Sequence, residues 1–232
     1  MRAAEPPPLR VAIVGAESTG KSQLARALAD ALAREFGLRV AVVDEYLRDW
    51  CDEHGRTPRA DEQAALAHEH QRRIDAACAR TDLDVVLCDT TPLMVAAYSD
   101  LLFADTTLYP SARVGMEAAD AIVLTALDLP WVADGLQRDG PHARAPVDAL
   151  VRARLVEWNV AWSLVTGHGD ARLANALDAL RPALRRRARR ATGAEDGLFL
   201  RLQSSLAGPP LRIRLCEFCD DPQCERHQLR VT

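Results

Sequence analysis

Short apolar runs recur along the chain, and each is bounded by polar, glycine or proline residues. Such runs are typical of strands that are buried on both faces of a sheet, because both sides of the strand must then be apolar. We therefore predict five strands, at Leu9–Val14, Arg39–Val43, Asp84–Cys88, Ala121–Thr125 and Ala161–Thr166.

Longer amphipathic segments alternate with these runs. In Ser22–Phe36, leucines at intervals of four fall on one helical face, and Gly37 ends the helix. We interpret Thr90–Pro92 as a break, and we predict the other helices at Glu45–His54, Asp61–Arg80, Pro110–Ala119, Pro146–Trp158 and Asp170–Arg190. Strands that alternate with helices predict an α/β fold, in which helices flank both faces of a parallel sheet.

The pattern divides the chain into three parts. The proline-rich residues 1–8 are predicted to be disordered, and residues 9–192 form the main domain. In the remaining residues, 193–232, Leu198–Gln203 and Leu211–Leu215 alternate like strands around a Gly-Pro-Pro turn, which predicts a small hairpin. Within the main domain, Asp128–Pro146 is rich in proline, glycine and charge, as mobile loops are.

Composition limits the class of protein. The chain has 48% hydrophobic and 27% charged residues, a net charge of −4, no long apolar run and no apolar leader. We expect a soluble cytoplasmic protein without a membrane partner. The acidic balance also argues against nucleic acid, although Arg181–Arg190 is a local basic run.

The segment Gly15–Ser22 matches G-x-x-x-x-G-K-[ST] and lies between a predicted strand and a predicted helix. Its glycines allow a tight turn whose N–H groups converge on phosphate oxygens at the positive end of the helix dipole. Lys21, the only lysine in the chain, would reach the β- and γ-phosphates of ATP, and the Ser22 hydroxyl would bind Mg²⁺. The alternative is a chance glycine-rich turn.

Carboxylates follow two of the predicted strands. Asp89 ends the run Val85–Cys88, where it can hold Mg²⁺ or simply terminate the strand. Asp44 and Glu45 follow the second strand, where a carboxylate can orient and deprotonate an acceptor hydroxyl. The nearby Tyr46 and Trp50 can stack on a flat ring, and the alternative for this tract is an acidic helix start with packed aromatics.

The loop after the fourth strand is a candidate lid over the site. It begins with Trp131, and its arginines Arg138 and Arg144 can neutralise charge on the transferred phosphoryl group. The alternative for these arginines is ordinary solvated surface charge.

Five blocks in one order resemble the ribosylnicotinamide kinase domain of NadR-type proteins. The blocks are Gly15-x-Glu17-Ser18-x-Gly20-Lys21-Ser22, Glu45-Tyr46-x-Arg48, His70-Gln71-Arg72-x-Ile74-Asp75, Asp89-Thr90 and Trp131-Val132-x-Asp134-Gly135-Leu136. The resemblance, over residues 10–182, implies a P-loop kinase fold that transfers a phosphoryl group from ATP to the 5′-hydroxyl of nicotinamide riboside. One departure is Thr91, where the family has an aspartate near the acceptor.

The resemblance also implies roles for individual residues. Glu45, Tyr46, Asp89 and Trp131 would line the nucleoside site, and Arg172 would lie near the adenine with the rest of Gly167–Arg172. The residues that would bind ATP are Gly15, Glu17, Ser18, Thr19, Gly20, Lys21 and Ser22.

Three cysteines and a histidine cluster near the end of the chain. The spacing Cys216-x2-Cys219-x4-Cys224-x2-His227 offers a Cys₃His set for tetrahedral Zn²⁺, and free or disulfide-paired cysteines are the alternative. A closed site of this kind would be structural. The alternative is a recognition knuckle that, with the Arg181–Arg190 run, contacts nucleic acid, a protein partner or a second copy of the chain. Cys51, Cys78 and Cys88 are interpreted as small core residues.

These features predict an enzyme, an ATP-dependent kinase whose leading acceptor is nicotinamide riboside. A regulatory ATPase that signals through its zinc tail is the second hypothesis, and a kinase for another nucleoside or nucleotide is the third. The choice of acceptor and of ATP or GTP stays open at this level.

Overall fold

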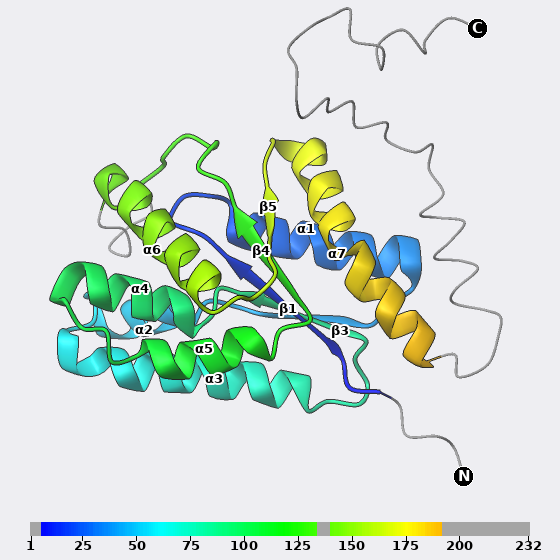
Figure 1. The fold of residues 1–232 in the computed structure, drawn as a ribbon, viewed down its shortest axis with the longest axis horizontal. Coiled ribbons are helices and arrows are strands. Elements are labelled where there is room, and N and C mark those ends of the chain that lie inside the picture. The colour runs from blue at the N-terminus through cyan, green and yellow to red at the C-terminus, as the bar shows by residue number, and fades with distance from the viewer. Residues whose placement is uncertain (1–5, 134–139, 192–232) are drawn as a thin grey trace, which may run out of the picture.

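The structure is a computed structural model that describes residues 6–133 and 140–191. Five strands form one parallel sheet in the order β2-β3-β1-β4-β5 (Figure 1). All five predicted strands are confirmed, as is the sheet flanked by helices. The strands are β1 (Leu9–Val14), β2 (Val40–Val43), β3 (Val85–Asp89), β4 (Ala121–Thr125) and β5 (Ser163–Val165).

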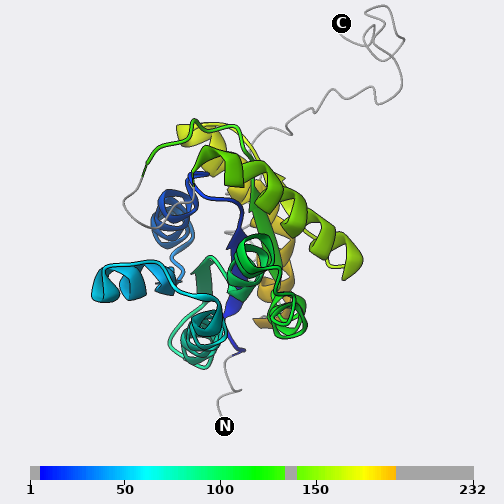
Figure 2. The same ribbon diagram turned by 90° about the vertical axis from the view of Figure 1, so that its left-hand side faces the viewer.

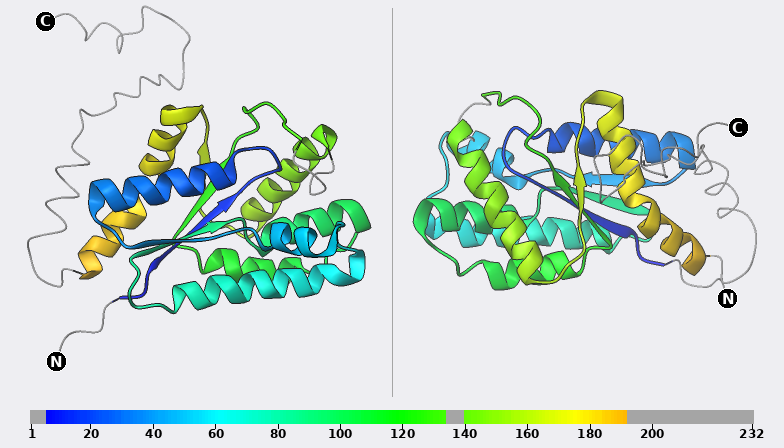
Figure 3. Two further views of the ribbon diagram at one scale, coloured as in Figure 1. Left: turned by 180° about the vertical axis from the view of Figure 1, so that it is seen from behind. Right: turned by 45° about the horizontal axis from the view of Figure 1, so that its top comes forward.

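Helices cover both faces of this sheet. On one face lie α1 (Lys21–Phe36) and α7 (Gly169–Ala191), seen above the sheet in the left view of Figure 3. The other face carries α3 (Gln63–Cys78), α4 (Pro92–Phe103), α5 (Tyr109–Glu117) and α6 (Arg144–Glu157). The short helix α2 (Tyr46–His54) lies at the periphery and contacts α3 (Figure 2).

The central strand β1 explains why two cores form. Successive side chains of a strand point to opposite faces of the sheet. Val11 and Ile13 accordingly pack with α1 and α7, whereas Ala12 and Val14 pack with α4, α5 and α6. The amphipathic face predicted for α1 is confirmed, because Leu24, Leu28 and Leu32 are buried there.

Helix α4 is the main element that the sequence pattern missed. A break does separate β3 from the next element at Thr90 and Thr91, but no helix was predicted directly after it, and Pro92 is the first residue of α4, a position where proline needs no N–H partner. The helix is apolar on nearly every side and packs between α3, α5 and α6. A helix that is apolar all round shows no 3.6-residue periodicity, so pattern analysis has nothing to detect.

Several other predictions concern loops, cysteines and termini. The loop after β4 is shorter than predicted, because a 3-10 turn covers Pro141–Ala143 and α6 then begins at Arg144. Cys51 and Cys88 are buried as predicted, but Cys78 is only half-buried. Of residues 1–8, the structure describes Pro6–Pro8, while the predicted hairpin and zinc cluster lie outside the described residues. No helix within the described ranges is long and apolar enough to cross a membrane.

Candidate active site

The phosphate-binding loop connects β1 to α1 at the carboxyl end of the sheet. Three of its residues adopt positive φ angles: Gly15 at 148°, Ser18 at 56° and Gly20 at 74°. Glycine tolerates such angles, whereas Ser18 is strained in the left-handed region. Gly20 is the residue before α1, so the free N–H groups of the first helical turn face the loop.

Two side chains hold the loop from inside. The Thr19 hydroxyl is fully buried, donates to the Ala16 carbonyl at 2.7 Å and lies 2.7 Å from the hydroxyl of Thr125. The Lys21 ammonium donates to the same Ala16 carbonyl at 2.9 Å. Both side chains thus hold the loop at the Ala16 carbonyl. Lys21 also lines the two adjacent cavities, so its ammonium can reach a ligand there.

Ser22 and Asp89 lie together as the Mg²⁺ prediction requires. Asp89 is the last residue of β3 and is only 2% exposed, and burial raises the pKa of its carboxyl despite a hydrogen bond from Ser22. Within the described part of the chain, Asp89 Oδ1 is a buried atom without a hydrogen-bond partner. One buried carboxylate oxygen beside a serine hydroxyl fits Mg²⁺, which binds few protein ligands and completes its shell with phosphate oxygens and water.

The two adjacent carboxylates Asp44 and Glu45 face different surroundings. Asp44 is exposed, with Arg26 at 3.6 Å. Glu45 precedes α2, is largely buried and accepts a hydrogen bond from Arg48 Nε at 3.1 Å. The structure thus brings Glu45, more than Asp44, toward the interior of the site.

The aromatic residues of the same tract also diverge. Trp50 is buried and its ring stacks on His54 with centroids 3.9 Å apart, so the idea that it stacks on a ligand is wrong and packing explains it. Tyr46 lines a cavity, and the guanidinium of Arg73 lies 4.1 Å from its ring centroid. Of Tyr46 and Trp50, it is therefore Tyr46 that is placed to meet a flat ligand.

His70 and Thr90 are site residues to which sequence reasoning gave no role. Buried His70 accepts the Tyr46 N–H at Nδ1 (3.2 Å), and its Nε2 lies 3.3 Å from the Thr90 carbonyl oxygen, to which it donates. Thr90 has a φ of 70°, a genuine outlier for a β-branched residue. His70 thereby ties the start of α2 to the strained residue after Asp89. Its only sequence signal was its block in the family resemblance.

Two cavities meet at the phosphate-binding loop. The larger, about 710 Å³, lies over Gly20, Ser22 and Asp89. The smaller, about 350 Å³, runs between α2, α3 and α4. Its apolar wall is formed by Tyr46, Leu47, Leu66, Met94, Val95, Tyr98, Leu102 and Phe103, and its polar groups include Thr57, Gln63 and His70. Ser18, Lys21, Glu45 and Arg48 line both cavities.

The loop after β4 is fastened to the phosphate-binding loop. The buried Glu17 carboxylate accepts hydrogen bonds at the same oxygen from the Trp131 indole (3.3 Å) and the Gly140 N–H (3.1 Å). The Ser18 hydroxyl accepts the Val132 N–H at 2.7 Å. Glu17, predicted to bind ATP, and Trp131, predicted to bind substrate, therefore contact each other.

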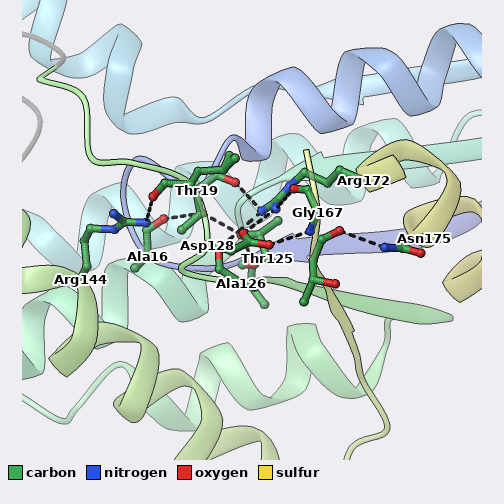
Figure 4. Close-up of polar contacts among 12 residues, drawn as sticks. Ala16, Thr19, Thr125, Ala126, Asp128, Arg144, Gly167, Arg172 and Asn175 are labelled. Carbon is green, nitrogen blue, oxygen red and sulfur yellow. Dashed lines mark hydrogen bonds and ion pairs between the residues drawn. The ribbon is translucent and has the colours of Figure 1, made fainter. Parts of the chain in front are cut away.

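The three predicted arginines have different positions. Arg138 lies outside the described residues. Arg144, at the start of α6, donates to the Leu129 carbonyl at 2.8 Å, and Leu129 lines the larger cavity. Arg172 is 5% exposed, and its guanidinium binds Asp128 and main-chain carbonyls inside the protein (Figure 4).

The described ranges, 6–133 and 140–191, contain no group of three or more His, Cys, Asp or Glu residues that could hold a metal ion by themselves. Cys216, Cys219, Cys224 and His227 lie outside these ranges, so the zinc site stays a prediction from spacing.

The sheet order, the strand–loop–helix unit at Gly15–Ser22 and the position of Asp89 define a P-loop domain. Comparison with family models gives the particular family. The model described as AAA domain matches residues 10–172, and the chain belongs to this family. A comparison with curated proteins finds no match.

Solved structures share the fold. One is a NadR protein in complex with NAD and AMP-PNP, which is 18% identical with a TM-score of 0.59 over 82% of this chain. Another is a NadR protein in complex with NR, 19% identical, with the same TM-score and coverage. The chain spans about half the length of these two structures, 51% and 52%.

Proposed function

We propose that this chain transfers a phosphoryl group from ATP to a hydroxyl of a small nucleoside, with nicotinamide riboside as the leading acceptor. The observation that carries the proposal is the junction of two cavities at Lys21 and Glu45. A polar cavity over the P-loop suits a nucleoside triphosphate, and a partly apolar cavity beside it suits a flat acceptor. The transferred group would pass between them.

The P-loop side would bind ATP. Loop N–H groups and Lys21 would hold the β- and γ-phosphates, with Lys21 leaving the Ala16 carbonyl when phosphate arrives. Ser22 and Asp89 would hold Mg²⁺, whose charge supplies stabilisation for the oxygens of the transferred group. Arg144, and Arg138 on the same connection, would complete the neutralisation of charge.

The acceptor side would be built around Glu45 and Tyr46. Among the described residues, Glu45 is the only carboxylate that lines both cavities, so it would orient the acceptor hydroxyl and take its proton. Thr91, which replaces the family's aspartate, is buried and donates to Met116 Sδ at 3.4 Å, and it lines neither cavity. Asp44 would contribute through its charge at the rim of the polar cavity.

The family and fold comparisons support this choice of acceptor. The AAA-domain match and the P-loop support nucleotide binding, and the two NadR structures are complexes with NAD and AMP-PNP and with NR. The Tyr46, Tyr98 and Phe103 rings line the acceptor cavity and would contact a flat base.

A phosphoryl-transfer assay tests the proposal. The chain is incubated with ATP, Mg²⁺ and a panel of nucleosides that includes nicotinamide riboside, and products are identified by mass. We expect one riboside to gain a phosphate with the wild type and none with Lys21→Ala at unchanged circular dichroism. ATP hydrolysis without a phosphorylated acceptor would replace the kinase by the regulatory ATPase, the second candidate.

We also propose the division of the chain into a kinase-like domain at residues 9–192 and a zinc-binding tail at residues 193–232. The proposal rests on the spacing of Cys216, Cys219, Cys224 and His227 and on the change in residue pattern. A closed Cys₃His site would stabilise a segment that is too short to build its own core, and it would offer a surface to a protein partner or a second chain.

A further inference from the structure

Arg172 lies in the first turns of α7 and is enclosed by main-chain oxygens. Its NH2 donates to the Thr19 carbonyl at 2.8 Å and approaches the Ala126 carbonyl at 3.5 Å, while NH1 donates to the Gly167 carbonyl at 2.9 Å (Figure 4). Its side chain is only 6% exposed. A buried guanidinium with this many fixed acceptors has little freedom to turn toward a ligand.

Asp128 orients this guanidinium. One carboxylate oxygen accepts from Arg172 NH1 at 2.8 Å, and the other accepts the Gly167 N–H at 2.6 Å. Burial opposes ionisation, but the hydrogen bonds from Arg172 and Gly167 keep the pKa of Asp128 below its usual range. Asp128 is therefore ionised at neutral pH and balances the buried positive charge.

The pair joins three loops that are far apart in the sequence. Thr19 belongs to the loop after β1, Asp128 follows β4, and Gly167 follows β5. In Figure 4 the Arg172 guanidinium lies among Thr19, Asp128 and Gly167. All three loops stand at the carboxyl ends of parallel strands, the edge where ligands bind in open α/β folds.

Thr19 is the residue of the phosphate-binding loop that the Arg172 guanidinium holds, and its neighbours are conformationally strained. It stands between Ser18 and Gly20, which both adopt left-handed backbone angles. Strained backbone conformations of this kind persist only where several contacts with the surrounding structure hold them in place. The Thr19 hydroxyl is held by Ala16 and Thr125, and its carbonyl is held by Arg172.

We propose that Arg172, oriented by Asp128, is a positioning residue that fixes the phosphate-binding loop in its binding conformation and couples that loop to the loop at Gly167. It acts through Thr19 and does not contact ATP. This replaces the earlier expectation that Arg172 itself binds the nucleotide. Lysine cannot substitute for Arg172, because its single ammonium nitrogen cannot reach the Thr19 and Gly167 carbonyls together, whereas the two terminal nitrogens of the planar guanidinium bind one each.

The inference rests on the ATP-binding half of the proposed function, so its test uses one readout that needs no ATP. Hydrogen exchange of the amides of residues 15–22 is measured in nucleotide-free protein, and the Kd of Mg-ATP is measured by calorimetry. The variants are Arg172→Lys and Asp128→Asn. The control is Arg187→Lys, because Arg187 lies on the same helix, has a side chain that is only 11% exposed and pairs with Asp84 at 3.1 Å at the opposite end of the sheet.

We expect Arg172→Lys and Asp128→Asn to speed exchange at residues 15–22 and to weaken ATP binding about tenfold, as loss of a charged hydrogen bond does. Arg187→Lys should lower the unfolding midpoint while leaving both readouts unchanged. Unchanged exchange at residues 15–22 in Arg172→Lys, or an equal change in Arg187→Lys, would overturn the proposal. If the wild type binds no ATP, the proposed function fails and the exchange data alone decide the positioning role.

Discussion

The hydroxyl oxygen of Thr125 lies 2.1 Å from the point that a Cβ atom would occupy on Gly15. Thr125 ends β4, and its hydroxyl oxygen also lies 2.7 Å from that of Thr19 and 3.2 Å from the Val14 carbonyl oxygen. The first glycine of the loop is thus required because a buried threonine fills the space beside it. The close approach of these two strand ends sets the path of the phosphate-binding loop.

This relationship predicts that Gly15→Ala destabilises the fold. The new methyl group would meet Thr125, which adds about 1–3 kcal/mol of overpacking to the strain of a positive φ. The control is Gly37→Ala, where φ is also positive but no atom lies within 4 Å of the added Cβ. It should cost only the backbone strain, about 1 kcal/mol. Urea unfolding measures both, and equal losses would contradict the steric argument.

Glu45→Gln should lower kcat, because Glu45 lines both cavities and an amide cannot accept a proton from the acceptor hydroxyl. General-base loss typically reduces the rate by about 10²–10⁴. Asp44→Asn, one residue earlier and exposed, should change kcat by less than about fivefold. Initial rates with saturating ATP separate the two. A larger effect from Asp44→Asn would move the base to that residue.

The buried His70 predicts a loss of stability in mild acid. Burial lowers the pKa of its imidazole, with Arg73 acting in the same direction and Asp89 and the Thr90 carbonyl opposing it. The native state therefore holds His70 neutral, while the unfolded chain takes up a proton below about pH 6.5. Stability should fall as pH drops from about 6.5 toward the lowered native pKa, because the unfolded state binds more protons there.

Urea unfolding between pH 7.5 and pH 5 measures this effect. In His70→Gln the decline over this range should be shallower than in the wild type, although the variant is less stable at pH 7.5. Parallel curves would show that other groups cause the acid sensitivity. His68→Gln, on the solvent-facing side of the same helix, is the control and should keep the wild-type slope.

Zinc analysis tests the C-terminal cluster. We expect purified chain to carry about one zinc ion per molecule, the stoichiometry of a closed Cys₃His site. Cys219→Ser should lose most of it, whereas Cys78→Ser, outside the cluster, should keep it. Mass spectrometry of the metal content decides this, and zinc retained by Cys219→Ser would contradict the assigned ligands.

Local signals predicted most of the architecture. The run Leu9–Val14, the motif that follows it and the amphipathic Ser22–Phe36 are contiguous, so short-range pattern and turn chemistry define that unit. Helix α4 could not be found this way, because its burial by three other helices removes the polar face on which periodicity depends.

The sequence by itself determined the parallel sheet, the P-loop and the residues that can carry phosphate chemistry, because each depends on neighbours within a few positions. Only the tertiary structure decided which side chains face the site. Trp50 packs against His54, Glu17 binds Trp131, and Arg172 binds the carbonyl of Thr19, 153 positions away. Which of several polar groups reaches a ligand and which holds a loop depends on long-range contacts between strand ends, and no local pattern encodes them.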